Sequence, residues 1–481
     1  MRLIDIINGI DAPIVGNAER EINDIQSDSR KVQQSSLFVA QAGVHVDGHK
    51  YIDSAIASGA TAVVCQQMPS SINSNVCYLQ VEDSNRALGI IADNFYNHPS
   101  RHLRLVGITG TNGKTTTVTL LQRMMRAAGH HAGLISTIVN KIDEQEYPTI
   151  NTTPDALTLN QLLHQMVEAG CEYCFMEVSS HAVVQQRIAG LTFAGGIFSN
   201  ITHDHLDYHK TMAAYIAAKK GFFDSLPQEA FALTNIDDRN GMVMMQNCRA
   251  TIKTYGLQHP ADFHCKVLED TFQGMLIELN GQEVWTRLVG RFNAYNLTAI
   301  YATAVLCGIE SLEALRLLSD LHAAEGRFEY VTGHGITAIV DYAHTPDALQ
   351  NVLQTINDIR NERQHLITVV GCGGDRDSTK RPEMALIAAN MSDKVVITSD
   401  NPRTEDPNKI LDDMESGIPN DKRWTVVRIT DRRQAIRTAC MMAQEGDIIL
   451  VAGKGHEKYQ EINGVRSHFD DKEELQHILL N

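Results

Sequence analysis

The sequence lacks an excess of positive charge. Its 42 lysines and arginines are outnumbered by 58 aspartates and glutamates, and the formal net charge is -16. Because nucleic acids and anionic membranes recruit basic faces, this balance argues against either as a partner. A phosphorylated ligand must therefore be held by a local site.

Paired cysteines are nearly absent as well. Nine cysteines are scattered singly along the chain, apart from Cys171 and Cys174. No second pair completes a zinc site or a disulfide framework, so reduced thiols in a cytoplasm fit best. No segment reaches the length of a membrane span, and the start MRLIDIINGI has Asp5 within its short apolar run and no small-residue cleavage site. We therefore expect a cytoplasmic protein without membrane insertion.

The 481 residues are too many for one ordinary core and indicate roughly three domains of about 150 residues. Short apolar runs in the first hundred residues surround one helical stretch at 48–59, which is typical of a small α/β domain. From about residue 103 the order is strand, loop, helix, and later strands run into polar or glycine-containing loops. Strands and helices alternate again after 325–329, which predicts a second doubly wound domain. We place the domains at 1–100, 101–326 and 327–481.

The stretch GITGTNGKTT, residues 107–116, resembles a phosphate-binding loop. Gly110 and Gly113 follow a predicted strand and directly precede a predicted helix. Backbone N–H groups there can cradle phosphate, Lys114 can neutralise the outer phosphates, and Thr115 can offer a hydroxyl to magnesium. The usual pattern would need a glycine where Ile108 stands, so we interpret the shorter spacing as the mark of a subtype.

A phosphate loop alone permits a kinase, a GTPase, an ATPase motor or a ligase. A guanine-reading N-K-x-D element is not evident, because the nearest stretch, 234–238, lacks the lysine. Glu177 ends a predicted strand, from which its carboxylate could reach a magnesium ion. The stretch 199–209 holds three histidines and two aspartates without an H-E-x-x-H pattern or a cysteine. This favours one histidine, His203, beside magnesium or nucleotide over a zinc centre.

Several further motifs carry a resemblance to a known family. These are NTTPD, EVSSH, SNITHDHLDYH, GRFNAYN, VDYAHTPDAL, GCGGDRD, SDNPRTEDP and GKGHEKYQ. Together with the phosphate loop they follow the order seen in the Mur ligases and cover nearly the whole chain. The sequence most resembles the members that extend UDP-N-acetylmuramoyl-L-alanyl-D-glutamate by a third peptide residue.

The resemblance implies a three-domain α/β fold. Its parts would be a small N-terminal UDP-binding domain, a central P-loop-type ATPase domain with a mostly parallel sheet, and a C-terminal Rossmann-like domain for the amino acid. It implies a monomeric ligase of peptidoglycan precursor synthesis that uses ATP and Mg²⁺ to turn a carboxylate into an acyl phosphate, which an amine then attacks. Positioning and charge stabilisation would supply most of the catalysis.

The resemblance also implies roles for individual residues. The catalytic residues would be Lys114, Glu177, His203 and Lys219. Within AYIAAKKGFF the family pattern selects Lys219 over Lys220 as a carbamylated lysine, and its new carboxylate would hold the metal together with Thr115, Glu177 and His203. The ATP contacts would be Gly110, Thr111, Asn112, Gly113, Lys114, Thr115, Thr116, Asn293, Arg327 and Asp341, with Asn296 and His344 in the same motifs.

The nucleotide-sugar substrate would occupy a second set of residues. Ser27, Ser29, Val44, His45 and Val46 match the uridine-binding part, and Asn151, Thr152, Thr153, Ser179, Gln185 and Arg187 match the muramoyl-dipeptide contacts. Residues 44–46 differ from the H-Q-A of some relatives, so only their backbone contacts carry over.

The amino acid added is either meso-diaminopimelate or L-lysine, which differ by a distal carboxylate. A site that selects meso-diaminopimelate needs paired hydrogen-bond donors for the distal carboxylate, and the planar guanidinium of arginine provides them. Arg403 in the D-N-P-R stretch and Arg376 can supply these donors. Lysine-adding members of the family generally lack the arginine that corresponds to Arg403. The resemblance thus implies a diaminopimelate site of Arg376, Asp400, Asn401, Pro402, Arg403, Gly453 and Glu457, with Asp400 and Glu457 on the distal ammonium.

Three alternatives stay open. An L-lysine-adding Mur ligase would share every motif except the arginine fork. A folylpolyglutamate synthetase would share the fold but not the D-N-P-R and G-K-G-H-E loops. A regulatory protein that uses ATP as a switch would need neither Lys219 nor Glu177 nor Arg403.

Overall fold

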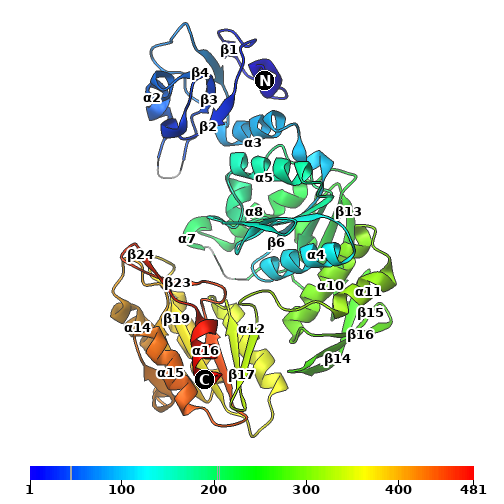
Figure 1. Cartoon of the computed structure of the whole chain (residues 1–481), viewed down its shortest axis with the longest axis vertical. Coiled ribbons are helices and arrows are strands. Elements are labelled where there is room, and N and C mark those ends of the chain that lie inside the picture. Colours follow the sequence, from blue (N-terminus) through cyan, green and yellow to red (C-terminus); the bar gives the residue numbers. More distant parts are fainter. Residues whose placement is uncertain (44–45, 203, 205, 481) are drawn as a thin grey trace.

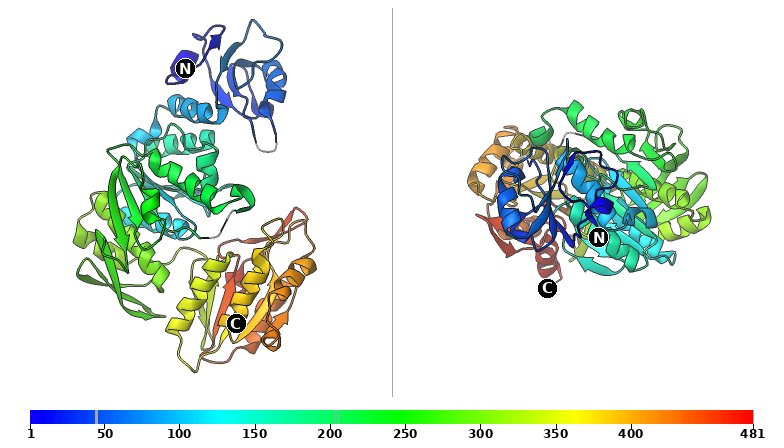
Figure 2. Two further views of the ribbon diagram at one scale, coloured as in Figure 1. Left: turned by 180° about the vertical axis from the view of Figure 1, so that it is seen from behind. Right: turned by 90° about the horizontal axis from the view of Figure 1, so that it is seen from above.

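The computed structural model describes residues 1–43, 46–202, 204 and 206–480, with residues 206 and 207 described by backbone only. Three sheets follow one another along the chain, and the N-terminal and C-terminal sheets lie at opposite ends of an elongated molecule (Figures 1 and 2). Among the described residues no helix is both long enough and apolar enough to cross a membrane.

The N-terminal sheet has five strands in the order β1-β5-β4-β3-β2, all parallel except β1. Its strands are β1 (Ile14–Val15), β2 (Asp24–Gln26), β3 (Ser36–Val39), β4 (Ala60–Cys65) and β5 (Cys77–Gln80). The helices are α1 (Leu3–Ile6), α2 (Ile52–Ala57) and α3 (Ser84–Phe95). The α3 helix begins where the Asp83 side chain accepts hydrogen bonds from the N–H groups of Asn85 and Arg86, as an N-cap should.

The central sheet has eleven strands in the order β16-β15-β14-β13-β12-β11-β6-β10-β7-β8-β9. Its middle is parallel: β6 (Arg104–Thr109), β7 (Ala132–Ile135), β10 (Tyr173–Glu177), β11 (Gly195–Phe198), β12 (Phe231–Asn235) and β13 (Thr251–Gly256). On one side β14 (Phe263–Thr271) still pairs parallel with β13, and β15 (Gly274–Leu279) runs antiparallel to both β14 and β16 (Gln282–Thr286). On the other side β8 (Asn140–Ile142) runs antiparallel to both β7 and β9 (Gln145–Tyr147).

Two apolar layers cover this sheet, because alternate residues of each strand point to opposite faces. On β6, Val106 and Ile108 pack with α4 (Lys114–Ala127), α10 (Arg291–Leu306) and α11 (Ser311–Ser319), whereas Leu105 packs with α5 (Ala156–Glu168) and α8 (Met212–Asp224). The short helices are α6 (Ser180–Val184), α7 (Leu206–His209) and α9 (Gly241–Met244). The carboxyl ends of the parallel strands therefore share one edge, where ligands of such sheets bind.

The C-terminal sheet has the order β17-β18-β22-β19-β20-β21 and is parallel except for β17. Its strands are β17 (Glu329–Gly333), β18 (Ile336–Asp341), β19 (Leu366–Cys372), β20 (Lys394–Ser399), β21 (Val426–Arg428) and β22 (Ile448–Ala452). One face packs on α12 (Pro346–Ile359), α13 (Lys380–Met391) and α14 (Pro407–Ser416), and the other on α15 (Arg432–Met442) and α16 (Asp471–Leu479). A separate hairpin joins β23 (Tyr459–Ile462) to β24 (Val465–His468).

The predicted α/β class with a mostly parallel central sheet is confirmed. The antiparallel extension β14–β16 was not predicted. Its middle strand β15 is mostly buried, with Met275, Ile277 and Leu279 in the core, whereas much of β14 and β16 is exposed. The division of the chain after residues 100 and 326 stays a prediction.

Candidate functional site

The phosphate loop connects the end of β6 at Thr109 to the start of α4 at Lys114. Gly110 has φ +154°, and a Cβ there would lie 1.9 Å from Oγ of Ser199. Gly113 has φ +87°, and a Cβ there would lie 2.5 Å from Oδ1 of Asn296. Only glycine allows this backbone path so close to its neighbours, which explains both glycines of the motif.

Lys114 folds back over this loop. Its Nζ donates hydrogen bonds to the carbonyl of Gly110 at 3.0 Å and to that of Thr111 at 2.8 Å. Burial lowers the pKa of Lys114 and the Arg327 charge adds to this, while Glu177 and Asp204 oppose it. The ammonium thus lies at the mouth of a phosphate-sized turn, from which it can reach an incoming phosphate.

Glu177 joins several predicted residues at the end of β10. Its Oε1 accepts hydrogen bonds from Oγ1 of Thr115 and from the backbone N–H of Thr137, both at 2.8 Å, and the residue is only 1% exposed. Oγ1 of Thr137 also donates to Oε2 at 3.2 Å. A hydroxyl and a carboxylate are hard oxygen donors that suit Mg²⁺, which needs only one or two carboxylates when phosphates supply the rest.

The metal contacts expected from the sequence also include a histidine. His203 lies outside the described residues. Within the described part of the chain, no cluster of three or more histidine, cysteine or acidic side chains is arranged to hold a metal. The oxygens of Thr115 and Glu177 fit a magnesium ion whose remaining ligands come from phosphate, water or a modified lysine.

The two neighbouring lysines of α8 have opposite environments. Lys219 is 2% exposed, and its Nζ donates to the carbonyl of Gly110 at 2.7 Å and lies 4.6 Å from the ring centroid of Tyr215. Burial, together with the Lys114 charge, holds the pKa of Lys219 well below its usual value. Lys220 instead forms a 2.5 Å ion pair with Asp224. Only Lys219 faces the phosphate loop, and its amine is shifted toward the neutral form.

Arg327 connects the C-terminal part of the chain to the phosphate loop. Its Nη2 donates to Oγ1 of Thr115 at 3.2 Å, and its guanidinium lies 4.6 Å from the ring centroid of Tyr342. Asp341 accepts a 2.7 Å hydrogen bond from the N–H of Phe328, and burial raises its pKa to about 6. Burial and the charge of Lys380 lower the pKa of His344 to about 4.

Three cavities adjoin one another around these residues. The first, of about 410 Å³, is lined by Asn112, Gly113, Thr116, Arg327 and Asp341 and by the aromatic rings of Tyr255, Phe292 and Tyr295. The second, of about 180 Å³, contains Lys114, Thr115, Glu177, Ser179 and Lys219 and shares Arg327 and Asp341 with the first. The third, of about 620 Å³, shares Thr137, Thr152, Tyr342 and His344 with the second. A molecule bound in the middle cavity therefore meets groups held in both others.

The third cavity brings together most of the predicted amino-acid residues, namely Arg376, Asp400, Asn401, Arg403, Gly453 and Glu457. Pro402 lies beside it, with its carbonyl so near Gly374 that a Cβ there would lie 1.9 Å away. Gly453 has φ +118°, and a Cβ there would lie 2.7 Å from Oδ2 of Asp400. Glycine at 453 thus keeps space open beside a carboxylate.

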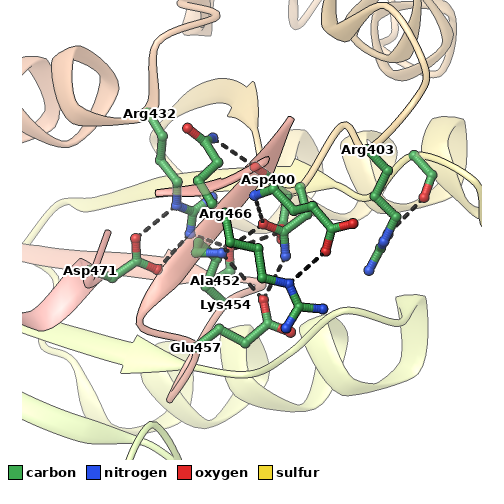
Figure 3. Close-up of polar contacts among 12 residues, drawn as sticks. Asp400, Arg403, Arg432, Ala452, Lys454, Glu457, Arg466 and Asp471 are labelled. Atoms are coloured by element: carbon green, nitrogen blue, oxygen red, sulfur yellow. Dashed lines mark hydrogen bonds and ion pairs between the residues drawn. The ribbon is translucent and has the colours of Figure 1, made fainter. Parts of the chain in front are cut away.

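A lysine that the sequence reasoning missed lies beneath these acids (Figure 3). Lys454 is fully buried, and its Nζ lies 3.2 Å from Oδ1 of Asn401, 3.2 Å from Oε2 of Glu457 and 3.9 Å from Oδ1 of Asp400. Nδ2 of Asn401 donates to Oε2 of Glu457 at 2.7 Å. Burial and the Asp400 charge raise the pKa of Glu457.

A buried ion pair fixes the strand that leads into this loop. Nε and Nη2 of Arg432 each donate to Asp471 at 2.7 Å, and Nη2 also donates to the carbonyl of Ala452 at 3.1 Å (Figure 3). Neither charged side chain is exposed, and a bidentate geometry compensates part of their desolvation. The pair ties α15 and α16 to the end of β22, just before Gly453.

The predicted muramoyl-dipeptide residues form a connected group beside Glu177. Oγ1 of Thr153 donates to the carbonyl of Glu177 at 2.8 Å and accepts from the N–H of Ser179 at 3.1 Å. Arg187 donates to the carbonyl of Thr153 at 2.6 Å and, through two nitrogens, to Oε1 of Gln185. Asn151 and Thr152 line the third cavity.

Other predicted residues lie apart from this group. Ser27, Ser29 and Val46 belong to the N-terminal part and line none of the three cavities, and Val44 and His45 lie outside the described residues. Asn293 is buried behind Asn296, whose Nδ2 donates to its Oδ1 at 3.1 Å, and Asn296 is the one that lines the first cavity. The rings of the first cavity were also missed, because isolated aromatic residues give no motif.

Comparison with known proteins shows the family of this chain. Three family models match the chain: "Mur ligase family, catalytic domain" at 21–96, "Mur ligase middle domain" at 108–304 and "Mur ligase, glutamate ligase domain" at 326–455. Proteins named UDP-N-acetylmuramoyl-L-alanyl-D-glutamate--2,6-diaminopimelate ligase from Phocaeicola vulgatus and Cytophaga hutchinsonii are each 54% identical to it. The alignments cover all of this chain and 100% and 99% of those proteins.

Comparison with solved structures also finds related ligases. One with that same ligase name is 33% identical, with a TM-score of 0.71, and the match covers 100% of this chain and 98% of that one. A folylpolyglutamate synthase from Thermotoga maritima is 15% identical, with a TM-score of 0.60 over 77% of this chain and 90% of that one. The latter likeness shows the fold alone.

Proposed function

Because this chain belongs to the Mur ligase family, we propose that it is an ATP-dependent ligase that joins meso-diaminopimelate to UDP-N-acetylmuramoyl-L-alanyl-D-glutamate. Its full-length relatives at 52% to 54% identity carry the name of that ligase. The observation that carries the proposal is the continuity of the three cavities, from a phosphate loop through a middle chamber to a chamber rich in arginine and acid.

The reaction follows from this order of cavities. ATP would lie in the first cavity, with its outer phosphates over Gly113 and Lys114 in the second. An oxygen of the glutamyl carboxylate attacks the γ-phosphorus and the bond to the β-phosphate oxygen breaks, which yields an acyl phosphate and ADP. The neutral amine of the amino acid then attacks the acyl carbon, phosphate leaves, and the nitrogen loses a proton as the amide forms.

The residues of the middle cavity serve this reaction by charge and position. Lys114 and Arg327 would stabilise negative charge on the transferred phosphoryl group, since both cations lie beside the first turn of α4. Thr115 and Glu177 would hold Mg²⁺, which when bound neutralises phosphate charge. Glu177 also fixes the loops of Thr137 and Thr153, so substrate carboxylate and phosphate would meet in a rigid frame.

We propose that Lys219 acts as a carbamate. Its amine, shifted toward the neutral form by burial, can add to carbon dioxide with loss of one proton. The product carries a carboxylate beside the phosphate loop, which adds an oxygen ligand for the ion held by Thr115 and Glu177. His203 is proposed as a further contact.

The substrate assignments extend the proposal to the remaining predicted residues. Thr152, Thr153, Ser179, Gln185 and Arg187 would bind the muramoyl dipeptide, and Ser27 and Ser29 the uridine. Arg376 and Arg403 would bind the distal carboxylate of diaminopimelate, and Asp400 and Glu457 its distal ammonium. We propose that the enzyme works as a cytoplasmic monomer on small-molecule substrates, consistent with buried or half-buried free cysteines.

Product formation tests this function directly. The purified protein is incubated with ATP, Mg²⁺, UDP-N-acetylmuramoyl-L-alanyl-D-glutamate and either meso-diaminopimelate or L-lysine, while phosphate release and the tripeptide product are measured. We expect both with meso-diaminopimelate and little with L-lysine. Phosphate release that does not depend on any amino acid would instead favour an ATP switch, and equal use of the two amino acids would remove the specificity claim alone.

A further inference from the structure

The hairpin β23–β24 forms one wall of the third cavity and carries a cation that the assignments above do not use. Tyr459, Glu461 and Arg466 all line this cavity. Nε of Arg466 donates to Oε2 of Glu461 at 3.0 Å, and its guanidinium lies 4.3 Å from the ring centroid of Tyr459. The Arg466 side chain is 63% exposed, and a charged hydrogen bond and a cation–π contact favour this one position for it.

Glu461 links this arginine to the predicted amino-acid site. Its N–H donates to Oδ1 of Asn401 at 3.0 Å, and its carbonyl accepts the N–H of Arg403 at 3.0 Å. The carbonyl of Arg403 in turn accepts the N–H of Asn463 at 2.7 Å. The hairpin therefore contacts both the backbone of Arg403 and the side chain of Arg466.

The charges around Asp400 and Glu457 indicate which group of the substrate Arg466 would contact. Asp400 and Glu457 carry two negative charges, and Lys454 beneath them supplies one positive charge. At this spot the two acids outnumber the lysine, which suits a substrate ammonium. In diaminopimelate the distal ammonium and the distal carboxylate are attached to the same carbon, so a carboxylate-binding group must lie beside these acids.

Arg466 meets that requirement. Arg466 and Glu457 line the same cavity. The hydrogen bond to Glu461 raises the pKa of Arg466, and Tyr459 and Glu457 contribute in the same direction. Arg403 uses Nη1 to donate to the carbonyl of Gly374 at 2.7 Å, and Arg466 uses Nε to donate to Glu461, so each guanidinium keeps further N–H groups for a ligand. A second guanidinium on the same wall completes the set of donors that a carboxylate accepts.

We propose that Arg466 is a specificity-determining residue that binds the distal carboxylate of the amino-acid substrate together with Arg403. This inference rests on the proposed function, because it concerns the amino acid that the ligase adds. It assigns to the hairpin a part in choosing diaminopimelate over lysine, whose side chain has no distal carboxylate.

The test compares R466A with wild type by steady-state kinetics. We expect the KM for meso-diaminopimelate to rise at least about tenfold, because a charge-assisted contact is lost, while kcat and the KM values for ATP and the UDP-sugar stay within about twofold. The kcat/KM for L-lysine, assayed at high concentration, should change little, so the preference for meso-diaminopimelate should fall about tenfold. R466K, which keeps the charge without the planar fork, should lie between the two.

Controls separate this inference from folding and from the proposed function. R363A removes an exposed arginine that precedes β19, at the opposite end of the C-terminal sheet, and should behave as wild type. Melting temperatures check that each variant is folded. Wild-type turnover of meso-diaminopimelate tests the function itself. The Arg466 assignment is overturned if folded R466A keeps the wild-type KM for meso-diaminopimelate, or loses both amino acids equally.

Discussion

Nη2 of Arg327 donates a hydrogen bond to Oγ1 of Thr115 across 212 positions of sequence. The arginine precedes the C-terminal sheet and the threonine lies in the first turn of α4, so the contact bridges two separately built parts of the chain. The same guanidinium stacks on Tyr342, whose ring centroid lies 4.9 Å from that of His456. The phosphate loop and the G-K-G-H-E loop are therefore joined through the side chains of Arg327, Tyr342 and His456, whose two rings are tilted by 43° to each other.

This bridge predicts a specific defect for R327A. The variant should lose about a hundredfold in kcat, because one preorganised cation is removed from the transferring phosphoryl group. The KM for meso-diaminopimelate should rise as well, since Tyr342 and His456 lose their support, whereas the KM for the UDP-sugar should not. Coupled measurement of ADP release gives these constants. If R327A changes kcat and the KM for ATP but not the KM for meso-diaminopimelate, the contacts through Tyr342 and His456 do not influence the amino-acid site.

Lys114 provides the sharpest test of the phosphate loop. K114A should lower phosphate release by about a hundred- to a thousandfold, because the ammonium over Gly110 and Thr111 is lost. K220A, which removes the half-buried partner of Asp224 outside the three cavities, is the matched control and should retain activity. Nearly unimpaired turnover by K114A would remove the loop from the mechanism.

Carbamylation of Lys219 can be observed without measuring activity. Equilibration with carbon-isotope-labelled bicarbonate should produce a carbamate carbon signal by nuclear magnetic resonance in wild type and in K220A. K219A should lack the signal, because the buried amine beside Gly110 is the only one of the two adjacent α8 lysines in a dry site. A signal of equal size in K219A would place the modification elsewhere.

The acid stability of the protein should depend on His456. Burial and nearby cations, Arg327 first among them, lower its pKa to about 3 from an ordinary value near 6.5. The unfolded chain then binds this proton near pH 6.5 while the folded chain does not. Stability present above pH 6.5 is therefore lost as pH falls toward 3, by up to about 1.4 kcal/mol per pH unit for each such group.

H456Q should flatten this dependence. Urea unfolding of the full chain between pH 7.5 and pH 5 measures the slope, and H322Q, at an exposed position, serves as the control. The slope should be shallower in H456Q and unchanged in H322Q. Equal slopes in wild type and H456Q would assign the acid sensitivity to other groups.

Arg403 should affect the binding of the amino acid and not the binding of ATP. R403A should raise the KM for meso-diaminopimelate at least about tenfold, through loss of the guanidinium and of its bond to Gly374, while the ATP constants stay near wild type. Isothermal titration with a non-hydrolysable ATP analogue checks that nucleotide binding persists. An unchanged KM for meso-diaminopimelate would refute the role of Arg403.

The sequence allowed prediction of what is local. The glycines of the phosphate loop follow a strand and precede a helix, so strand end, backbone conformation and helix start were all readable from one stretch. The D-N-P-R and G-K-G-H-E loops likewise follow parallel strands, whose carboxyl ends share an edge.

What the sequence did not reveal depends on packing between distant segments. In the sequence, Lys454 is one polar residue of a glycine-containing loop. Its role follows only from its burial beneath Asp400 and Glu457 in the structure. The choice between Asn293 and Asn296 depends on the rotation of α10 about its axis, because residues three apart share a face but differ in depth. The contact of Glu461 with Arg403 depends on where a hairpin folds back.

Arg403 also has a backbone conformation that arginine rarely adopts, with φ +52°. Glycine and asparagine occupy this left-handed region far more readily, and holding another residue there costs on the order of 1 kcal/mol or more. The backbone at this position thus favours residues that lack the charged, planar donor fork of arginine. Under the proposed role of Arg403, exchange for glycine or asparagine would relieve this backbone strain and lose the selectivity for diaminopimelate, so stability and choice of substrate favour different residues at this one position.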